Sequence, residues 1–380
     1  MRFYTYVKNI TCLFFSISLT ACGGGGGGGK DEIGANPLPP ASSSLVATES
    51  SHSSNSSSQP ISSSSYPASS SSRSSINNSA AMLEGHIWHS FNDLDNPEGT
   101  FVMNPNTGVS LSVQAEKWGI PWPDGTAFIN KEYEPDDAPE DTTRITVYRS
   151  NDKAILNDQL IEGYVGYIAP SPTHKDRILA HWGETIFSPR ILIVWDLSTQ
   201  KVLFGIEPGE SFDALSWMPD GTLLHVQASG AISKVVIGGD EQLLGTVNWP
   251  ESRVPQAVYV SPDGTRALVQ LAELRDTGTV AWVDLWMMNI DGTEMRRFTN
   301  NGLIADAYWS PDSRNVAFVK DTGISCSDST CMGSCTVWLA PATATEVVAV
   351  QASGDAKQFP LQRPNGSMTT LRCPVMAWTL

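Results

Sequence analysis

The stretch VYVSPDGTRALV, residues 258–269, decides the fold because its central motif recurs along the chain. Related stretches are WPDGTAFI at 122–129, SPTHKDRIL at 171–179, MPDGTLLHV at 218–226 and SPDSRNVAFV at 310–319. Their prolines, at positions 123, 172, 219, 262 and 311, are separated by 49, 47, 43 and 49 residues. A regular period of this length is typical of repeat proteins in which each unit is one supersecondary structure.

Each unit contains residues that form a tight turn. Proline presets φ at the first turn position, aspartate bonds to nearby backbone amides, and glycine accepts a positive φ. The alternating apolar run that follows, as in 315–319, predicts a strand. The second unit has Thr173-His174-Lys175 in place of Asp-Gly, so we expect a longer turn there. The repeat-turn residues are Pro123, Asp124, Gly125, Pro219, Asp220, Gly221, Pro262, Asp263, Gly264, Pro311 and Asp312.

Each period also holds a second apolar run and a further turn, as in 191–204, which makes about four strands. Four-stranded repeats of this length predict the blades of a β-propeller. Residues 85–380 provide six such units, although only five proline turns are visible. We therefore expect 375–380 (VMAWTL) to be the first strand of a unit that 85–113 completes. The prediction is an all-β, six-bladed propeller closed by pairing of the N- and C-terminal strands in one blade, which removes an exposed sheet edge.

The repeats resemble those of TolB-like propellers, also called PD40 or WD40-like β-propeller repeats. Residues 308–312 (YWSPD) and 260–264 (VSPDG) match the family's WSPDG-type core, and 286–292 (WMMNIDG) with 296–299 (RRFT) resembles its neighbouring stretches. The resemblance covers most of 85–380 and implies the fold. It implies little about function, because the family includes envelope scaffolds, peptidase accessory domains and a few lyases.

The first 21 residues predict a signal peptide. Arg2 and Lys8 precede an apolar run, 10–19, that is too short to span a bilayer. Leu19-Thr20-Ala21-Cys22 resembles the lipobox of bacterial lipoproteins, which implies lipid attachment at Cys22. The next residue is Gly23 and not aspartate, which resembles lipoproteins that are sorted to the outer membrane. We expect a protein anchored in the cell envelope, on the periplasmic or surface face of the outer membrane. The alternative is a cytosolic chain in which Cys22 is buried by chance.

Residues 22–81 are rich in Gly and Ser and contain too little apolar material to form a core. They predict a disordered, flexible tether that ends where the propeller, residues 82–380, begins. Its polyserine composition is similar to linkers of polysaccharide-degrading proteins, although a plain spacer is the simpler interpretation. The chain has 24 Lys+Arg and 40 Asp+Glu, a net charge of -16, which argues against nucleic acid as a partner.

Cysteine usage suggests disulfides, because four cysteines remain in the predicted exported domain. A bond from the 326–335 loop to the C-terminal cysteine would staple the ring closure and contribute about 2–4 kcal/mol. Three pairings are open, and a metal site is the less favoured alternative because no histidine is near. The candidates are Cys326, Cys331, Cys335 and Cys373.

Catalysis has no local signature: the chain lacks G-x-S-x-G, H-E-x-x-H, a P-loop and a dinucleotide fingerprint. The histidines are scattered over different units, and His86 and His89 would point to opposite faces of a strand. The acidic run 132–141 lacks the spacing of known calcium loops. We therefore expect no cofactor, no metal and no enzymatic activity, although histidines from separate blades could still form a metal site on the axis.

Tryptophan offers a further recognition chemistry. Four tryptophans, at 122, 217, 309 and 378, occupy the repeat position and are expected in the blade core. Five others could stack on sugar rings if exposed, although core packing is the simpler expectation for each. These five are Trp118, Trp182, Trp249, Trp282 and Trp338.

Three functions remain compatible with the sequence. The favoured one is a membrane-anchored, non-catalytic module whose propeller binds or scaffolds a protein or glycan partner. The second is a polysaccharide lyase or hydrolase with a metal site on the propeller axis. The third is an outer-membrane assembly scaffold.

Overall fold

The computed structural model describes most of the chain from Met82 to the C-terminus. The described residues are 82–90, 99–115, 119–135, 138–186, 188–206, 213–250, 253–274, 280–300, 302–327, 330–348, 356–363, 365–372 and 374–380. The predicted signal peptide, the lipidated Cys22 and the tether lie outside them. Within the described ranges every regular element is a β-strand, and no helix is long and apolar enough to cross a membrane.

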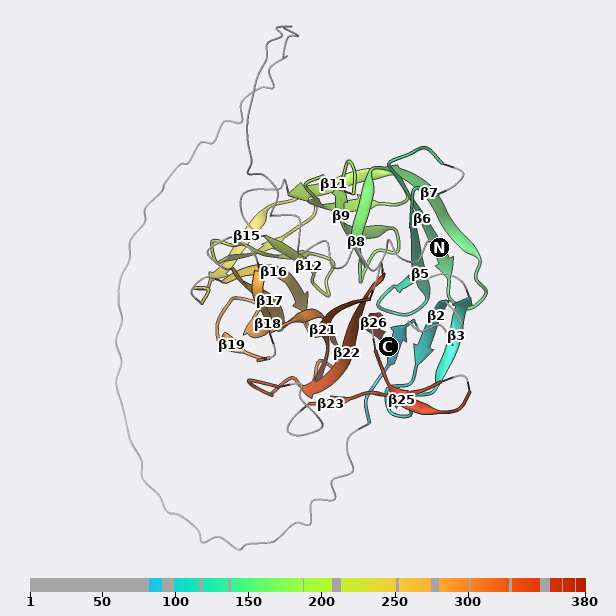
Figure 1. Cartoon of the computed structure of the whole chain (residues 1–380). Helices are drawn as coiled ribbons and strands as arrows, with labels where there is room; N and C mark the ends of the chain where they lie inside the picture. Colours follow the sequence, from blue (N-terminus) through green and yellow to red (C-terminus); the bar gives the residue numbers. More distant parts are fainter. Residues whose placement is uncertain are drawn as a thin grey trace, which may run out of the picture. The chain divides into compact units, whose positions relative to one another are not determined.

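The strands form six four-stranded antiparallel sheets that are arranged in a ring, which is a six-bladed β-propeller (Figure 1). Blade 1 contains, from the axis outward, β26 (Val375–Thr379), β1 (His86–His89), β2 (Gly99–Met103) and β3 (Ser110–Ala115). Blade 2 contains β4 (Ile120–Pro121), β5 (Ala127–Tyr133), β6 (Thr142–Arg149) and β7 (Ile155–Glu162). Blade 3 contains β8 (Tyr164–Pro170), β9 (Arg177–Gly183), β10 (Ile191–Asp196) and β11 (Lys201–Ile206).

The other three blades repeat this order. Blade 4 contains β12 (Ala214–Trp217), β13 (Leu223–Val226), β14 (Ala231–Val235) and β15 (Glu241–Thr246). Blade 5 contains β16 (Arg253–Val260), β17 (Arg266–Leu274), β18 (Val280–Asn289) and β19 (Arg296–Arg297). Blade 6 contains β20 (Ile304–Trp309), β21 (Asn315–Ser327), β22 (Thr330–Pro341) and β23 (Lys357–Gln358). A small hairpin, β24 (Pro360–Gln362) and β25 (Met368–Thr370), precedes the last strand.

The ring closes in blade 1, as predicted from the sequence. The C-terminal strand β26 pairs with β1, and Ile87 lies opposite Trp378 in the ladder. The indole of Trp88 donates to Thr379 Oγ1 at 3.0 Å, and the indole of Trp378 donates to the Glu84 carbonyl at 2.8 Å. Both ends of the chain therefore contribute to one sheet.

The turns between the first and second strands of blades 2 to 6 lie at one end of the axis. In blades 2, 4 and 5 the glycine amide donates to the carbonyl three residues earlier at 2.8–2.9 Å. Asp124, Asp220 and Asp263 each accept the amide two residues ahead at 3.0–3.1 Å. We call these five turns the turn ring; they are 122–126, 171–176, 218–222, 261–265 and 310–314.

Neighbouring turns of the ring contact one another. The amide of Asp263 donates to Ser313 Oγ at 3.0 Å, and Lys175 of blade 3 forms an ion pair with Asp124 of blade 2. Gly221 has a φ of +83°, and an added Cβ would lie 2.1 Å from Thr173 Oγ1, so only glycine fits there. The blade 3 turn is one residue longer than the blade 5 turn, as its sequence suggested, because its closing bond spans six residues rather than five.

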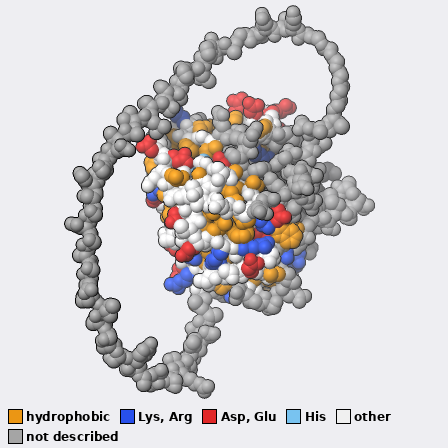
Figure 2. Space-filling view, turned by 90° about the vertical axis from the view of Figure 1, so that its left-hand side faces the viewer, with side chains coloured by type: hydrophobic (Ala, Val, Ile, Leu, Met, Phe, Trp, Pro, Cys, Tyr) orange, Lys and Arg blue, Asp and Glu red, His pale blue; other side chains and the backbone are white. Residues whose placement is uncertain are grey.

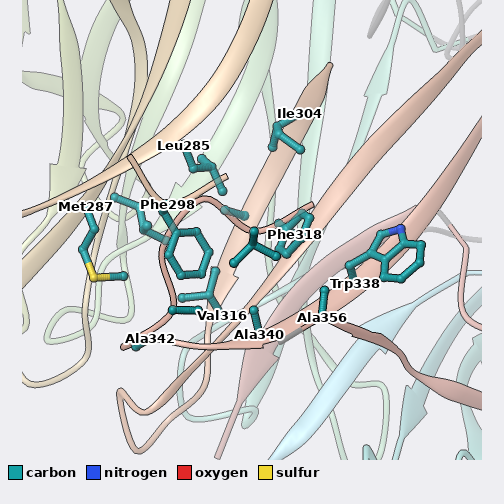
Figure 3. Packing of buried hydrophobic residues seen from close by; sticks show 14 of the residues in the cluster. Leu285, Met287, Phe298, Ile304, Val316, Phe318, Trp338, Ala340, Ala342 and Ala356 are labelled. Atoms are coloured by element: carbon teal, nitrogen blue, oxygen red, sulfur yellow. The ribbon is translucent and has the colours of Figure 1, made fainter. Parts of the chain in front are cut away.

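The core lies between adjacent sheets. Trp122, Trp217, Trp309 and Trp378 are all buried. Two of them link blades: Trp217 donates to the Ala169 carbonyl at 2.8 Å, and Trp309 donates to the Tyr259 carbonyl at 2.9 Å. Between blades 5 and 6, Phe298 packs edge-on against Phe318 with ring centroids 6.3 Å apart (Figure 3).

Three of the four candidate cysteines lie on β21 and β22 of blade 6. Cys335 is buried and disulfide-bonded, and its partner lies outside the described side chains. Cys326 and Cys331 are Cα partners in the ladder between β21 and β22, and Cys373 lies outside the described residues. The pairing therefore stays a prediction.

Candidate functional site

Polar side chains from three innermost strands interact across the propeller axis. On β20 in blade 6, Asp306 Oδ2 lies 2.5 Å from the hydroxyl of Tyr308, and Asp306 Oδ1 accepts the amide of Ala307 at 2.8 Å. The hydroxyl of Tyr259, on β16 in blade 5, also bonds to Asp306. Tyr167 is on β8 in blade 3, which faces blade 6 across the ring, and it interacts electrostatically with Asp306. We call Tyr167, Tyr259, Asp306 and Tyr308 the axial site.

Burial sets the protonation of the axial site. It raises the pKa of Asp306, although the hydrogen bonds from Tyr308, Ala307 and Tyr259 oppose that rise. Burial and the charge of Asp306 together hold the pKa values of Tyr259 and Tyr308 well above their ordinary range. The tyrosine hydroxyls are therefore neutral at pH 7 and act as hydrogen-bonding groups.

Tyr167 is the accessible member of the axial site, because 45% of it is exposed. Burial and the charge of Asp306 nevertheless raise its pKa, as expected for a ring that solvent reaches but protein surrounds. Its ring lies 5.6 Å from that of His181 on β9. Tyr167 thus connects the axial site with a second cluster.

That second cluster, the cationic group, consists of Lys131, His181 and Arg190 around Tyr164. The guanidinium of Arg190 lies 4.8 Å from the ring centroid of Tyr164, and Lys131 Nζ lies 5.6 Å from it. Lys131 Nζ also donates to the carbonyl of Val165 at 3.0 Å and to that of Gly166. The lysine therefore holds the start of the innermost strand β8 in place.

Burial and mutual repulsion shift the pKa values of the cationic group. Burial, together with the charge of Arg190, lowers the pKa of Lys131 to about 7. Burial and then the charges of Arg190 and Lys131 lower the pKa of His181 to about 4. His181 is therefore neutral at pH 7 and offers one N–H donor, whereas Arg190 keeps its full charge.

The other histidines have structural surroundings. His86 is exposed, whereas His89 is fully buried and its Nε2 lies 2.9 Å from Ser110 Oγ. His225 lies between Glu241, at 3.0 Å, and Asp213, at 3.4 Å. Across the described part of the chain, no three His, Cys, Asp or Glu side chains are placed to hold a metal ion. The ring of His181, in contrast, lies beside that of Tyr167 in the axial site.

One of the five non-repeat tryptophans, Trp282, is clearly exposed. Trp338 is buried, Trp182 and Trp249 are half-buried, and Trp118 lies outside the described residues. Trp282 is 42% exposed, and its indole donates to Asp284 Oδ2 at 2.8 Å. An added Cβ at Gly302 would lie 2.0 Å from the indole Cε2, so one side of this tryptophan is covered by the Gly302 backbone.

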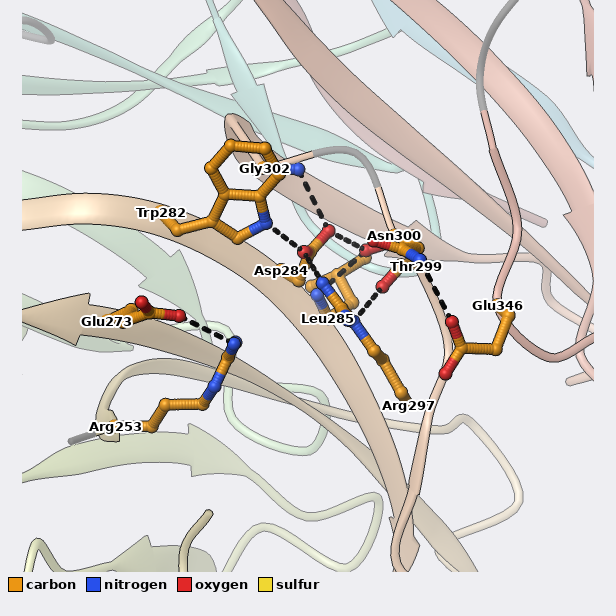
Figure 4. A network of polar contacts seen from close by, with 10 residues as sticks. All are labelled: Arg253, Glu273, Trp282, Asp284, Leu285, Arg297, Thr299, Asn300, Gly302 and Glu346. Carbon is orange, nitrogen blue, oxygen red and sulfur yellow. Dashed lines mark hydrogen bonds and ion pairs between the residues drawn. The ribbon is translucent and has the colours of Figure 1, made fainter. Parts of the chain in front are cut away.

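The network behind Trp282 is centred on the fully buried carboxylate of Asp284 (Figure 4). It accepts from Arg297 Nη2 at 2.6 Å, from Thr299 Oγ1 at 2.8 Å and from the amide of Gly302 at 3.2 Å. A buried charge that is satisfied this fully fixes the backbone around it. The network orders the connection from blade 5 to blade 6 and leaves no carboxylate edge for a ligand.

The acidic run gives no site among the described residues. Tyr133 donates to Asp141 at 2.8 Å across the connection between β5 and β6, and residues 136–137 lie outside the described ranges. The calcium alternative therefore has no support here, and the metal-free expectation stays a prediction.

The outer wall carries scattered apolar side chains. Figure 2 shows the side of blades 4 and 5, where apolar, acidic and basic groups are interspersed. On outermost strands Leu111, Ile155, Val202 and Leu243 are at least half exposed. Single exposed apolar residues of this kind are ordinary surface features.

The sequence predictions missed the axial site and the cationic group. A signal for part of it exists: Tyr259 and Tyr308 both stand three positions before a repeat proline, on the strand nearest the axis. The corresponding residues of blades 2 and 4 are Ile120 and Ser216. A repeated position occupied by tyrosine in adjacent blades 5 and 6 indicates a local polar specialisation.

Comparison with known proteins gives similarity in fold. No family model and no curated protein matches the chain. Among solved structures, TolB from Acinetobacter baumannii is 14% identical with a TM-score of 0.44, covering 70% of this chain and 66%, just under two thirds, of that one. A candidate TolB from Agrobacterium tumefaciens is 14% identical with a TM-score of 0.44, covering 76% of this chain and 97% of that one.

An oligogalacturonate lyase from Vibrio parahaemolyticus is 11% identical with a TM-score of 0.41, covering 60% of this chain and 69% of that one. At such identities and TM-scores the likeness carries no argument about function. The fold is established by the strand pairing, and the function is argued from the axial site.

Proposed function

We propose that the chain is a membrane-tethered, non-catalytic binding module of the bacterial cell envelope, and that its partner, a glycan or a protein, contacts the axial site. One observation carries the proposal: the accessible Tyr167 interacts electrostatically with Asp306, which is hydrogen-bonded to Tyr259 and Tyr308. Aromatic rings and neutral hydroxyls offer contact area and hydrogen bonds at a low cost in conformational entropy.

The state of the axial groups supports binding rather than catalysis. The tyrosines hold their protons, and Asp306 is already engaged by Tyr308, Ala307 and Tyr259. Protonated tyrosine hydroxyls of this kind recognise hydrogen-bonding partners and are poorly suited to releasing protons at neutral pH.

An enzymatic alternative, a lyase or hydrolase acting on polysaccharides, has one observation in its favour. The pKa of Lys131, about 7, is the value expected of a general base. Its Nζ, however, donates to the carbonyls of Val165 and Gly166, so the ammonium form has a positioning task in β8. We therefore place this alternative second.

The proposed location in the cell rests on the sequence. The lipobox-like Leu19-Thr20-Ala21-Cys22 and the Gly/Ser-rich segment 22–81 support a lipid anchor with a flexible tether, in the outer membrane. Cys22→Ser should move the full chain from the membrane fraction to the soluble fraction of a Gram-negative host. Retention of this variant in the membrane fraction would refute the anchor, with Ser43→Ala in the tether as the control.

Photocrosslinking in intact cells tests the binding proposal. The full chain is produced with a photoreactive phenylalanine analogue in place of Tyr167, and in a control in place of Leu111, which is 70% exposed on the outer strand β3. We expect an adduct of one defined mass at 167 and none at 111. An adduct at 111 alone would move the partner to the outer wall, and recovery of a cleaved glycan would favour the enzymatic alternative.

A further inference from the structure

Arg190 pairs with no carboxylate among the described residues, and its guanidinium lies over a tyrosine ring instead. Its Nη2 donates to the Ile186 carbonyl at 3.2 Å, and its guanidinium lies over the ring of Tyr164. In contrast, five arginines form ion pairs: Arg144, Arg149, Arg177, Arg253 and Arg297. Arg266 and Arg296 also form no ion pair with a carboxylate in the described part of the chain, but they donate to the carbonyls of Ser313, Ala342 and Ala344. N–H groups of Arg190 are therefore available to an anionic ligand.

The cations near Arg190 make an anion more favourable there. Lys131 and Arg190 lie over the same ring, that of Tyr164. The positive charge of each lowers the pKa of His181. Cations held together repel one another, and an anion placed among them offsets that repulsion. The arrangement thus provides positive potential beside the axial site of an acidic protein.

His181 supplies a second hydrogen-bond donor, next to Arg190. Its ring nitrogens make no hydrogen bond to the described part of the chain, and they are not among its fully buried atoms. The ring lies beside Tyr167, the accessible member of the axial site. A ligand that reaches His181 therefore also meets the face of Tyr167.

The backbone of β8 lies close to the guanidinium at Gly166. A Cβ added at Gly166 would lie 3.7 Å from Arg190 Nη1 and 3.3 Å from the Tyr164 ring. Because residue 166 is glycine, β8 places no side chain at this position next to Arg190 and His181, and Tyr164 is the β8 residue whose ring lies against the guanidinium.

We infer that the cationic group binds the carboxylate of the ligand, with Arg190 and His181 as the donors and Tyr167 in contact with the adjoining part of the ligand. The planar fork of Arg190 matches a carboxylate, and one full charge suits a monoanion better than a phosphate dianion. Lys131 adds potential and positions β8. This inference rests on the proposed function, because it names the chemistry of the ligand at the same axial site.

Four probes test the inference with the full-length chain in detergent. Glucuronate and glucose share a sugar ring and differ in the carboxylate, and trialanine and trialanine amide differ in the C-terminal carboxylate. Dissociation constants are measured by calorimetric titration. We expect at least one carboxylate probe to bind at least about tenfold more tightly than its neutral counterpart, as for other charge-assisted contacts. The pair that shows the difference identifies the source, a sugar acid or a peptide terminus.

Variants connect the difference to the residues. Arg190→Gln should abolish the preference for the carboxylate, Arg190→Lys should keep part of it, and His181→Asn should reduce it. Arg149→Gln, which removes an arginine from the exposed ion pair with Asp152, is the matched control and should bind like the parent. Melting curves identify any variant that does not fold, and the remaining ones still decide the test.

Equal binding of the charged and neutral probes, no binding of any probe, or no effect of Arg190→Gln would overturn the inference. Tyr167→Ala separates this failure from failure of the proposed function. If Tyr167→Ala loses the partner detected in cells while Arg190→Gln keeps it, the axial site stands without a carboxylate. If neither change matters, the partner binds elsewhere and both are wrong.

Discussion

The two ends of the propeller are built differently. At the turn ring, the same bonds recur in successive blades, and neighbouring turns contact one another, as Asp263 does with Ser313. The opposite end, which we call the loop end, contains connections of unequal length, such as 134–141, 184–190 and 227–230. Arg190 and the network of Asp284 belong to the loop end. The repeated positions therefore build the scaffold, while much of the recognition chemistry lies outside the repeat.

Removal of residues 375–380 should have the largest effect on stability, because it deletes the strand that closes the propeller ring. It removes β26 from blade 1 together with the bonds Trp88–Thr379 and Trp378–Glu84. We expect loss of the cooperative melting transition in calorimetry. Removal of the exposed Leu380 alone is the control, and an unchanged melting curve for the longer deletion would refute closure by β26.

Asp284→Ala should produce the next largest effect, at the loop end. The side chain is fully buried, and its loss leaves the guanidinium of Arg297 without a carboxylate. Breaking a buried ion pair costs about 3–5 kcal/mol of unfolding free energy. Asp152→Ala, in an exposed pair with Arg149, should cost less than about 1 kcal/mol. Urea unfolding measures both, and equal losses would contradict the role of the network.

Acid should lower the free energy of unfolding through His89, which is the last residue of β1 and lies at the loop end. Burial lowers the pKa of His89 to about 4, whereas the unfolded chain titrates near 6.5. As pH falls through 6.5, the unfolded chain takes up the proton first, so stability decreases, by about 2–3 kcal/mol at pH 4.5. His89→Gln should flatten the dependence of unfolding free energy on pH, and His86→Gln, at an exposed site, should not. Parallel curves for all three proteins would exclude His89 as the cause.

Gly221→Ala should reveal the contact between neighbouring turns. Gly221 and Gly238 both have positive φ, +83° and +77°, so alanine strains the backbone at either site. Only at 221 would the added Cβ meet a neighbour, Thr173 Oγ1, and overpacking costs about 1 kcal/mol or more beyond the strain. Thermal unfolding should therefore rank Gly221→Ala below Gly238→Ala, with recovery in the double variant Gly221→Ala/Thr173→Ala. Equal melting temperatures would mean that the turns stabilise their own blades alone.

The fold could be predicted from the sequence because its signals are local. Proline, aspartate and glycine at fixed offsets form the turns, and the period between them gives the number of blades. Ring closure followed from the same count, since 375–380 (VMAWTL) supplied the strand that the sixth unit lacked. These inferences need no knowledge of which blades face each other.

The site could not be predicted in this way because it depends on proximity across the ring. Tyr167 and Asp306 are far apart in sequence and interact only because blades 3 and 6 are opposite. Arg190 and His181 are not in the repeated turn, and a single charged residue in a loop carries no pattern. The spacing of Tyr259 and Tyr308 before the repeat prolines was the one available signal.

One measurement tests the division between scaffold and site most directly: the ligand-induced shift of the melting temperature for Tyr167→Ala and Gly221→Ala in the full chain, against a panel of glycans and peptides. We expect Tyr167→Ala to melt like the parent and to lose the shift, whereas Gly221→Ala should melt at a lower temperature and keep it. A shift that survives Tyr167→Ala, or that disappears in Gly221→Ala, would contradict the account.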